Sequence, residues 1–163
     1  MKVKVDSIES GLINNDDEII SWTSRYATGI KVIDNQHREL VKLINQLHQA
    51  CLLGEEGARP VYKEAMHKMV EYVRFHFTAE LEILAQIKYP DYNDHKKQHD
   101  NLIRDILVAA KESKEGKKFV PNHFVRTLMD WVFGHIAIYD KRYSEYVTDL
   151  KKKGLFPDQQ FSK

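Results

Sequence analysis

The chain has 163 residues, 42% of them hydrophobic and 30% charged, which is typical of a single globular domain that can bury a sizeable core. A net charge of +1 provides no basic field to attract nucleic acid or anionic lipid. There is no apolar run of the roughly 18 residues that a membrane span needs, no signal-peptide core, and only one cysteine, so the sequence favours a cytoplasmic protein without an internal disulfide.

The first helix is predicted to follow a polar arm and a loop. Residues 1–19 are expected to form the arm, and residues 22–33 carry aromatic side chains without a helical period, so we interpret them as a packed loop that covers one end of a bundle. Asp34 is a candidate N-cap, and Gly54 and Gly57 are expected to end the helix after about residue 53. The three-and-four spacing of a core-facing stripe is met by Ile33, His37, Leu40, Val41, Ile44, Leu47 and Cys51.

The second and third helices are predicted on either side of a turn at residues 89–93. Pro60 suits the first turn of the second helix, which is expected to continue to about Ile87. The third helix is expected to begin near Asp91 or Asp94 and to end at Gly116. The inward positions are Met69, Val73, His76, Glu80, Leu84 and Ile87 in the second helix, and His95, His99, Ile103, Ile106 and Ala110 in the third.

The fourth helix is predicted to begin at Pro121, and its pattern extends through Tyr143 and Tyr146 to Gly154. Its apolar face comprises Phe124, Leu128, Trp131, Val132, His135 and Ile138. Four amphipathic helices with short joints predict an all-α fold, an up-down-up-down four-helix bundle. We expect the bundle to span residues 20–153 and residues 154–163 to form a C-terminal tail.

Two pairs of polar residues lie on the apolar stripes at helical spacing. His76 and Glu80 are four residues apart, as are His95 and His99, so each pair points two metal-binding side chains from one helix face. Antiparallel helices joined at the turn would bring the pairs face to face. Burial of imidazoles and a carboxylate among aliphatic side chains is costly unless they are satisfied, and a metal would satisfy all of them.

Helical phase decides which of the remaining histidines can join this cluster. His37 and His135 lie on the stripes of their own helices and can meet the pairs at one depth of the bundle. His67 faces about 180° away from His76, whereas His48 and His123 lie roughly 16 to 18 Å along their helices from the cluster. The cluster therefore takes one or two histidines from each helix.

Asp140 is five residues after His135, which places it about 140° off the face of an ideal α-helix. It could join the cluster only if the helix widens locally, as a π-bulge does, or kinks near His135. From spacing alone, the favoured reading is an exposed acid beside Lys141 and Arg142.

Five histidines with one or two carboxylates exceed the ligands of a single tetrahedral zinc and fit two metals with bridging carboxylates. Nitrogen-rich ligation suits iron, copper, nickel or zinc and argues against magnesium and calcium. Carboxylate-dominated di-iron bundles use two Glu-x-x-His motifs, and the only match here, Glu64 with His67, faces away.

Together these residues resemble the hemerythrin family, in particular its single-domain bacterial members, over roughly residues 20–150. The opening signature is similar to Trp22, Tyr26, Thr28-Gly29-Ile30, Ile33-Asp34 and Gln36-His37, and the later motifs to His76-Phe77 with Glu80, His95 with His99, and Trp131 with His135-Ile136 and Asp140. The family commonly has a second glutamate directly after the bridging one, where this chain has Leu81. That glutamate is not among the family's ligands.

The resemblance implies a non-haem di-iron centre with an oxo or hydroxo bridge, and it reverses the reading of Asp140. By position, His95, His99 and His135 would bind one iron, His37 and His76 would bind the other, and Glu80 and Asp140 would bridge them. In the family, O₂ binds reversibly at the iron with two histidines. Candidate walls of a dry O₂ pocket are Leu40, Ile44, Trp131 and Ile136, although each is equally well explained as core packing.

The leading hypothesis is therefore reversible O₂ binding for carriage, storage or delivery, with no enzymatic role, because no general base or nucleophile is evident beyond the ligands. The alternative is an O₂-sensing or redox-sensing interaction module that uses the same site. A third is redox catalysis at the iron pair, such as peroxide or nitric oxide turnover. An O₂-consuming or signalling protein would be the partner, whereas nucleic acid and membrane are not expected.

Overall fold

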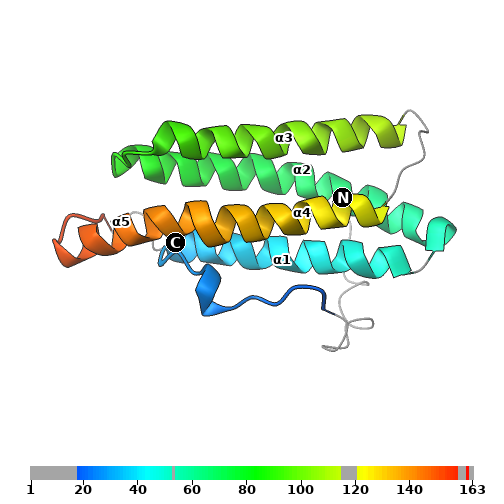
Figure 1. Cartoon of the computed structure of the whole chain (residues 1–163), viewed down its shortest axis with the longest axis horizontal. Coiled ribbons are helices and arrows are strands. Elements are labelled where there is room, and N and C mark those ends of the chain that lie inside the picture. The colour runs from blue at the N-terminus through cyan, green and yellow to red at the C-terminus, as the bar shows by residue number, and fades with distance from the viewer. Residues whose placement is uncertain (1–17, 53, 115–120, 158–160, 162–163) are drawn as a thin grey trace, which may run out of the picture.

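The computed structural model describes residues 18–52, 54–114, 121–157 and 161. They form α1 (Lys31–Leu52), α2 (Gly54–Gln86) and α3 (Tyr92–Lys114), each of which is one rod of the bundle. The fourth rod consists of α4 (Pro121–Gly134), the π-helical η3 (His135–Asp140) and α5 (Lys141–Lys152), which follow one another directly. The four rods lie side by side and alternate in direction (Figure 1). The prediction of an all-α, up-down-up-down four-helix bundle is confirmed.

The joint between the first two helices differs from the prediction. Gly54 is the first residue of α2, and Gly57 lies inside α2, so neither glycine lies beyond the end of a helix as expected. Pro60 also lies inside α2 and not in its first turn, where it removes one helical hydrogen bond. The prediction relied on local propensities, which are weak priors that tertiary context can override.

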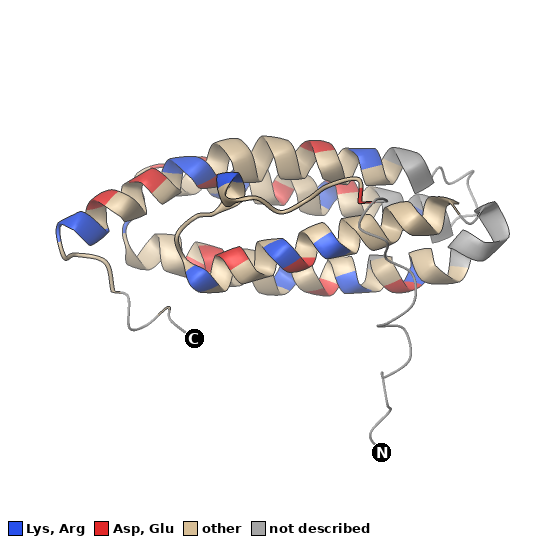
Figure 2. Cartoon of the chain, turned by 90° about the horizontal axis from the view of Figure 1, so that it is seen from below, with Lys and Arg blue, Asp and Glu red and all other residues tan. Residues whose placement is uncertain are grey.

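The segment that precedes α1 is packed, as predicted, but it runs along the side of α1 and does not cover an end of the bundle (Figures 1 and 2). Near its start, Asn45 of α1 accepts hydrogen bonds from the backbone N–H groups of Ile19 and Ile20, both at 3.1 Å, and donates to the Ile20 carbonyl at 2.7 Å. Of the predicted polar arm at residues 1–19, residues 1–17 lie outside the described residues.

The other end of this segment is held by Asp34. Its carboxylate accepts hydrogen bonds from the backbone N–H of Thr28 at 2.7 Å, the Thr28 hydroxyl at 2.8 Å and the N–H of Gly29 at 3.3 Å. The N-cap prediction for Asp34 is wrong, since α1 begins at Lys31 and Asp34 lies in its first turn. Gly29 has a φ of +80°, a conformation that suits glycine where the chain turns into the helix.

Two apolar clusters fill the bundle. The larger contains Leu40, Met69, Phe77, Leu102 and Ile136, and the smaller contains Ile33, Ile83, Leu84, Tyr143 and Val147. On each rod that contributes to both clusters, a short polar interval separates them. His37, Glu80 and Asp140 lie in these intervals, whereas His76 and His135 directly precede Phe77 and Ile136 of the larger cluster. The site described below comprises these residues together with His95 and His99 of α3.

Two inward predictions are wrong. Ile103 is 36% exposed, and Leu102 takes the inward position on α3 with 2% exposure. Ile138 is 51% exposed, because η3 changes the helical phase at that point. The side chain of Ala110 lies outside the described residues. Within the described ranges, no helix combines the length and apolarity required to cross a membrane.

Candidate metal centre

Every rod of the bundle contributes at least one histidine to a single buried cluster. His37 comes from α1, His76 from α2, His95 and His99 from α3, and His135 from the start of η3. Each of these five side chains is at most 2% exposed. Glu80 of α2 and Asp140 at the end of η3 lie among them, with exposures of 1% and 0%.

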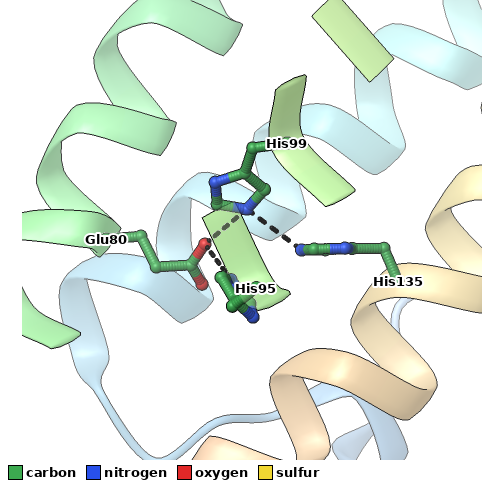
Figure 3. Close-up of side chains that lie close together, drawn as sticks. All are labelled: Glu80, His95, His99 and His135. Carbon is green, nitrogen blue, oxygen red and sulfur yellow. Dashed lines mark hydrogen bonds and ion pairs between the residues drawn. The ribbon is translucent and has the colours of Figure 1, made fainter. Parts of the chain in front are cut away.

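Two histidines contact one oxygen of Glu80, and a third histidine lies against one of them (Figure 3). The Oε2 atom of Glu80 lies 3.1 Å from Nε2 of His95 and 3.0 Å from Nε2 of His99, and Nε2 of His99 lies 3.0 Å from Nε2 of His135. One ligand atom from each of these four residues lies within 4.8 Å of the others. This group therefore has the size and donor atoms of a single metal site.

A second group shares Glu80 with the first. His37, His76 and Glu80 also offer ligand atoms that lie within 4.8 Å of one another. Asp140 connects the two groups, because its Oδ2 lies 3.2 Å from Nε2 of His37 and its Oδ1 lies 3.0 Å from Nε2 of His135. Both carboxylates are thus placed between three histidines on one side and two on the other.

The π-helical η3 explains how Asp140 reaches the cluster. A π-helical turn widens the ring so that residues five apart share a face, which matches the interval from His135 to Asp140. The same extra residue turns Ile138 outward. The reading of Asp140 as an exposed acid, drawn from α-helical spacing, is wrong, because the spacing argument assumed an undistorted helix.

The arrangement of polar atoms fits a pair of metal ions. Among the described residues, Nε2 of His37, Nε2 of His76 and both carboxylate oxygens of Asp140 are buried without a hydrogen-bond partner. Such atoms are costly to bury, and two imidazole nitrogens 3.0 Å apart, as in His99 and His135, cannot both point lone pairs at each other without a cation or proton between them. Imidazole and carboxylate donors together suit first-row transition metals.

The comparisons with known proteins agree with this geometry. Residues 28–147 match the family model of the hemerythrin HHE cation binding domain, which covers well over half of the chain. The chain belongs to the hemerythrin family. This confirms the resemblance drawn from the sequence motifs, and the cluster of histidines and carboxylates is its candidate cation-binding site.

Individual relatives of this hemerythrin-family chain support the same assignment. It is 33% identical over 141 residues to a bacteriohemerythrin of Pseudomonas aeruginosa, covering 82% of this chain and 90% of the relative. It is 27% identical over 126 residues to a bacteriohemerythrin of Methylococcus capsulatus, covering 77% and 94% of the two chains. A crystal structure of wild-type hemerythrin matches 78% of this chain and 96% of its own length, with a TM-score of 0.72 and 26% identity.

Several side chains that the sequence analysis did not assign hold the hemerythrin histidines in place. Nδ1 of His76 lies 2.8 Å from Oε1 of Gln36, so this amide oxygen accepts the Nδ1 proton and leaves Nε2 free to face the cluster. Phe77 stacks on His99 with ring centroids 3.6 Å apart and planes within 2°. Gln36 and Phe77 each directly precede or follow a cluster histidine, and adjacency alone does not indicate such a contact.

The four predicted pocket residues lie in the larger apolar cluster or against it. Leu40, Ile44 and Ile136 are each at most 1% exposed. Trp131 packs against the same cluster, and its indole stacks on His135 with centroids 4.5 Å apart and an angle of 11°. The three aliphatic side chains are buried and Trp131 is partly buried, while the role of all four as walls of an O₂ pocket stays a prediction.

The three histidines that helical phase places outside the cluster have different surroundings. His67 is exposed, with 75% of its side-chain surface accessible, and its Nε2 lies 3.7 Å from the Glu71 carboxylate on the surface of α2. His48 is half-buried on α1 and belongs to neither metal-binding group among the described residues. The side chain of His123 lies outside the described residues.

Burial and mutual charge set the protonation of the cluster. Desolvation lowers the pKa of His76 to about 3 and also lowers the pKa of His99, so both imidazoles are neutral at pH 7, the form in which an imidazole can bind a metal. Burial alone would raise the pKa of Glu80, but hydrogen bonds from His95 and His99 outweigh it and hold that pKa well below its usual range. Burial and the charge of Glu80 likewise oppose ionisation of Asp140, yet His135 and His37 keep its pKa low.

These shifts predict that the metal-free protein loses stability on mild acidification. The folded-state pKa of His76 is depressed, so below about pH 6.5 the unfolded chain binds a proton that the folded chain excludes, at a cost of up to about 1.4 kcal/mol per pH unit until the folded pKa is reached. The lowered pKa of His99 acts in the same direction, and the raised pKa of His95 partly offsets both. Urea midpoints of the metal-free protein should fall between pH 7 and pH 5, and equal midpoints would contradict this.

Proposed function

We propose that the chain binds O₂ reversibly at a non-haem, carboxylate-bridged di-iron centre, for carriage, storage or delivery of O₂. The proposed ligands are His37, His76, Glu80, His95, His99, His135 and Asp140. Membership of the hemerythrin family and the burial of all seven side chains at one depth of the bundle support this assignment.

The observation that carries the proposal is the unequal number of protein donors on the two sides of the carboxylates. On one side are three histidines, His95, His99 and His135, and on the other are two, His37 and His76. If the two metal ions have the same coordination number, the ion on the two-histidine side would have one more coordination position without a protein ligand. The iron pair, when bound, supplies the electrons that make O₂ binding reversible, and the free position is where we place O₂.

The protein's own part is to hold neutral imidazoles and to exclude water. Gln36 fixes the tautomer of His76, and the aromatic rings of Phe77 and Trp131 lie flat against His99 and His135. Leu40 and Ile44 on α1, which carries His37, and Ile136 next to His135 are buried apolar residues, and we place them as walls that keep protons and reductants away from bound O₂. Such a setting supports binding in preference to turnover.

The test is metal analysis combined with absorption spectra of the reduced protein before and after O₂. We expect about two irons per chain, because the candidate ligands form two groups that share Glu80, and a visible absorption band that appears with O₂ and disappears when O₂ is removed. The zinc-loaded protein serves as the control and should show no spectral response. Tight binding of zinc with no uptake of iron, or steady-state peroxide or nitric oxide turnover well above autoxidation, would contradict the proposal.

A further inference from the structure

The two shared carboxylates are held in different ways. Asp140 directs its two oxygens to different groups, with Oδ1 facing His135 and Oδ2 facing His37. Glu80 instead directs one oxygen, Oε2, to His95 and His99, and the same oxygen lies 3.9 Å from Nε2 of His76. The other oxygen of Glu80, Oε1, accepts a hydrogen bond from the hydroxyl of Tyr143.

Tyr143 is well placed to define the direction of this hydrogen bond. It belongs to α5 and lies 63 residues from Glu80 in sequence, so the hydroxyl comes from a different helix than the carboxylate. Its side chain is 0% exposed, and its ring meets His95 edge-on, with centroids 5.4 Å apart and an angle of 74°. The ring of Tyr89 also meets the Tyr143 ring edge-on, with centroids 6.2 Å apart and an angle of 78°. Packing therefore leaves the hydroxyl little freedom to turn away.

Glu80 needs such support more than Asp140 does. A glutamate has one more rotatable bond than an aspartate, so its carboxylate can rotate and shift more readily unless a neighbour fixes it. Partners that hydrogen-bond to a ligating carboxylate orient it toward the metal. We infer that Tyr143 is a positioning residue that holds Oε1 of Glu80 and thereby keeps Oε2 directed at both histidine groups.

This inference rests on the proposed metal site, and the test separates the two. Tyr143→Phe removes only the hydroxyl, and Tyr146→Phe is the matched control on the same helix. The hydroxyl of Tyr146 donates to the backbone carbonyl of Ile87 at 3.2 Å, away from the cluster. Each metal-free protein is titrated with Co²⁺ without O₂, and the visible spectrum, which reports the cobalt coordination, is recorded at each step.

We expect wild type and Tyr146→Phe to bind two Co²⁺ per chain with the same spectrum. Tyr143→Phe should bind at least one Co²⁺ about 10- to 100-fold more weakly and with an altered spectrum, as is usual when a partner of a metal ligand is lost. A purely structural role would lower the thermal midpoint of the metal-free protein without changing the cobalt spectrum.

The outcomes distinguish the two ideas. If wild type binds fewer than two Co²⁺ per chain, the proposed di-metal site is wrong. If wild type binds two and Tyr143→Phe binds them with equal affinity and an unchanged spectrum, the role of Tyr143 is wrong. Should Tyr143→Phe fail to fold by circular dichroism, the crystal structure of cobalt-loaded wild type decides: a Tyr143 hydroxyl still hydrogen-bonded to Oε1 supports the inference, and a displaced hydroxyl overturns it.

Discussion

Replacing His99 with alanine should reduce bound iron from about two atoms per chain to one or fewer, because the three-histidine group would lose its most central imidazole. Nε2 of His99 lies 3.0 Å from Glu80 Oε2 and 3.0 Å from Nε2 of His135, so it contacts two other members of that group. The O₂-dependent absorption band should disappear with the metal. Iron content after reconstitution, with circular dichroism to verify the fold, measures the effect.

The matched control is His67→Ala on the surface of α2. Because 75% of the His67 side-chain surface is accessible and its Nε2 faces the exposed Glu71, its loss should leave iron content unchanged. If both variants lost iron equally, the phase argument that places His76 inside and His67 outside would be wrong for α2.

The ligand stripes could be predicted because they depend on a local property of the chain. His76 with Glu80 and His95 with His99 keep α-helical spacing inside regular helices, so periodicity alone fixes the face on which each pair lies. The bundle follows from the same stripes. Periodicity is less reliable at the edge of a stripe. Ile103 was predicted to face inward, but its neighbour Leu102 takes the inward position.

Asp140 and Ile138 could not be placed by the same argument. A π-helical turn has no sequence signature comparable to a glycine or proline, and one such turn moves every later residue by about a quarter of a helical turn relative to α-helical counting. The spacing argument therefore assigned Ile138 and Asp140 to the wrong faces. The family resemblance did place Asp140 in the cluster, because the family's motif includes an aspartate at this position whatever the helix geometry.

The hydrogen bonds of Gln36 and Tyr143 to the cluster could not be predicted from the sequence for a different reason. Gln36 reaches His76 across 40 residues, and Tyr143 reaches Glu80 across 63, so both depend on how two helices rotate against each other. The segment before α1 is similar, since Asn45 and Asp34 bind backbone groups that any sequence would present there. Contacts of this type follow from packing and leave no periodic trace.

Replacing Asp140 with alanine should have the largest effect on the pairing of the two metals. Asp140 is the carboxylate whose oxygens face separate groups, with Oδ2 3.2 Å from His37 and Oδ1 3.0 Å from His135. Without it, Glu80 is the only carboxylate between the two histidine groups, and Glu80 directs a single oxygen, Oε2, at them. We expect at most about one iron per chain and no O₂-dependent band, measured by metal analysis and absorption.

The same substitution should destabilise the metal-free protein at neutral pH, because the depressed pKa of Asp140 means that the fold stabilises its ionised carboxylate in spite of burial and the charge of Glu80. The folded-state pKa of Asp140 is depressed, so its contribution is present at neutral pH and is lost only as the pH falls below the ordinary range of an aspartate. Asp149→Ala is the control, because Asp149 makes an exposed ion pair with Lys153 on α5. Retention of two irons by Asp140→Ala would show that Glu80 alone can join the two groups, and the bridging role of Asp140 would have to be abandoned.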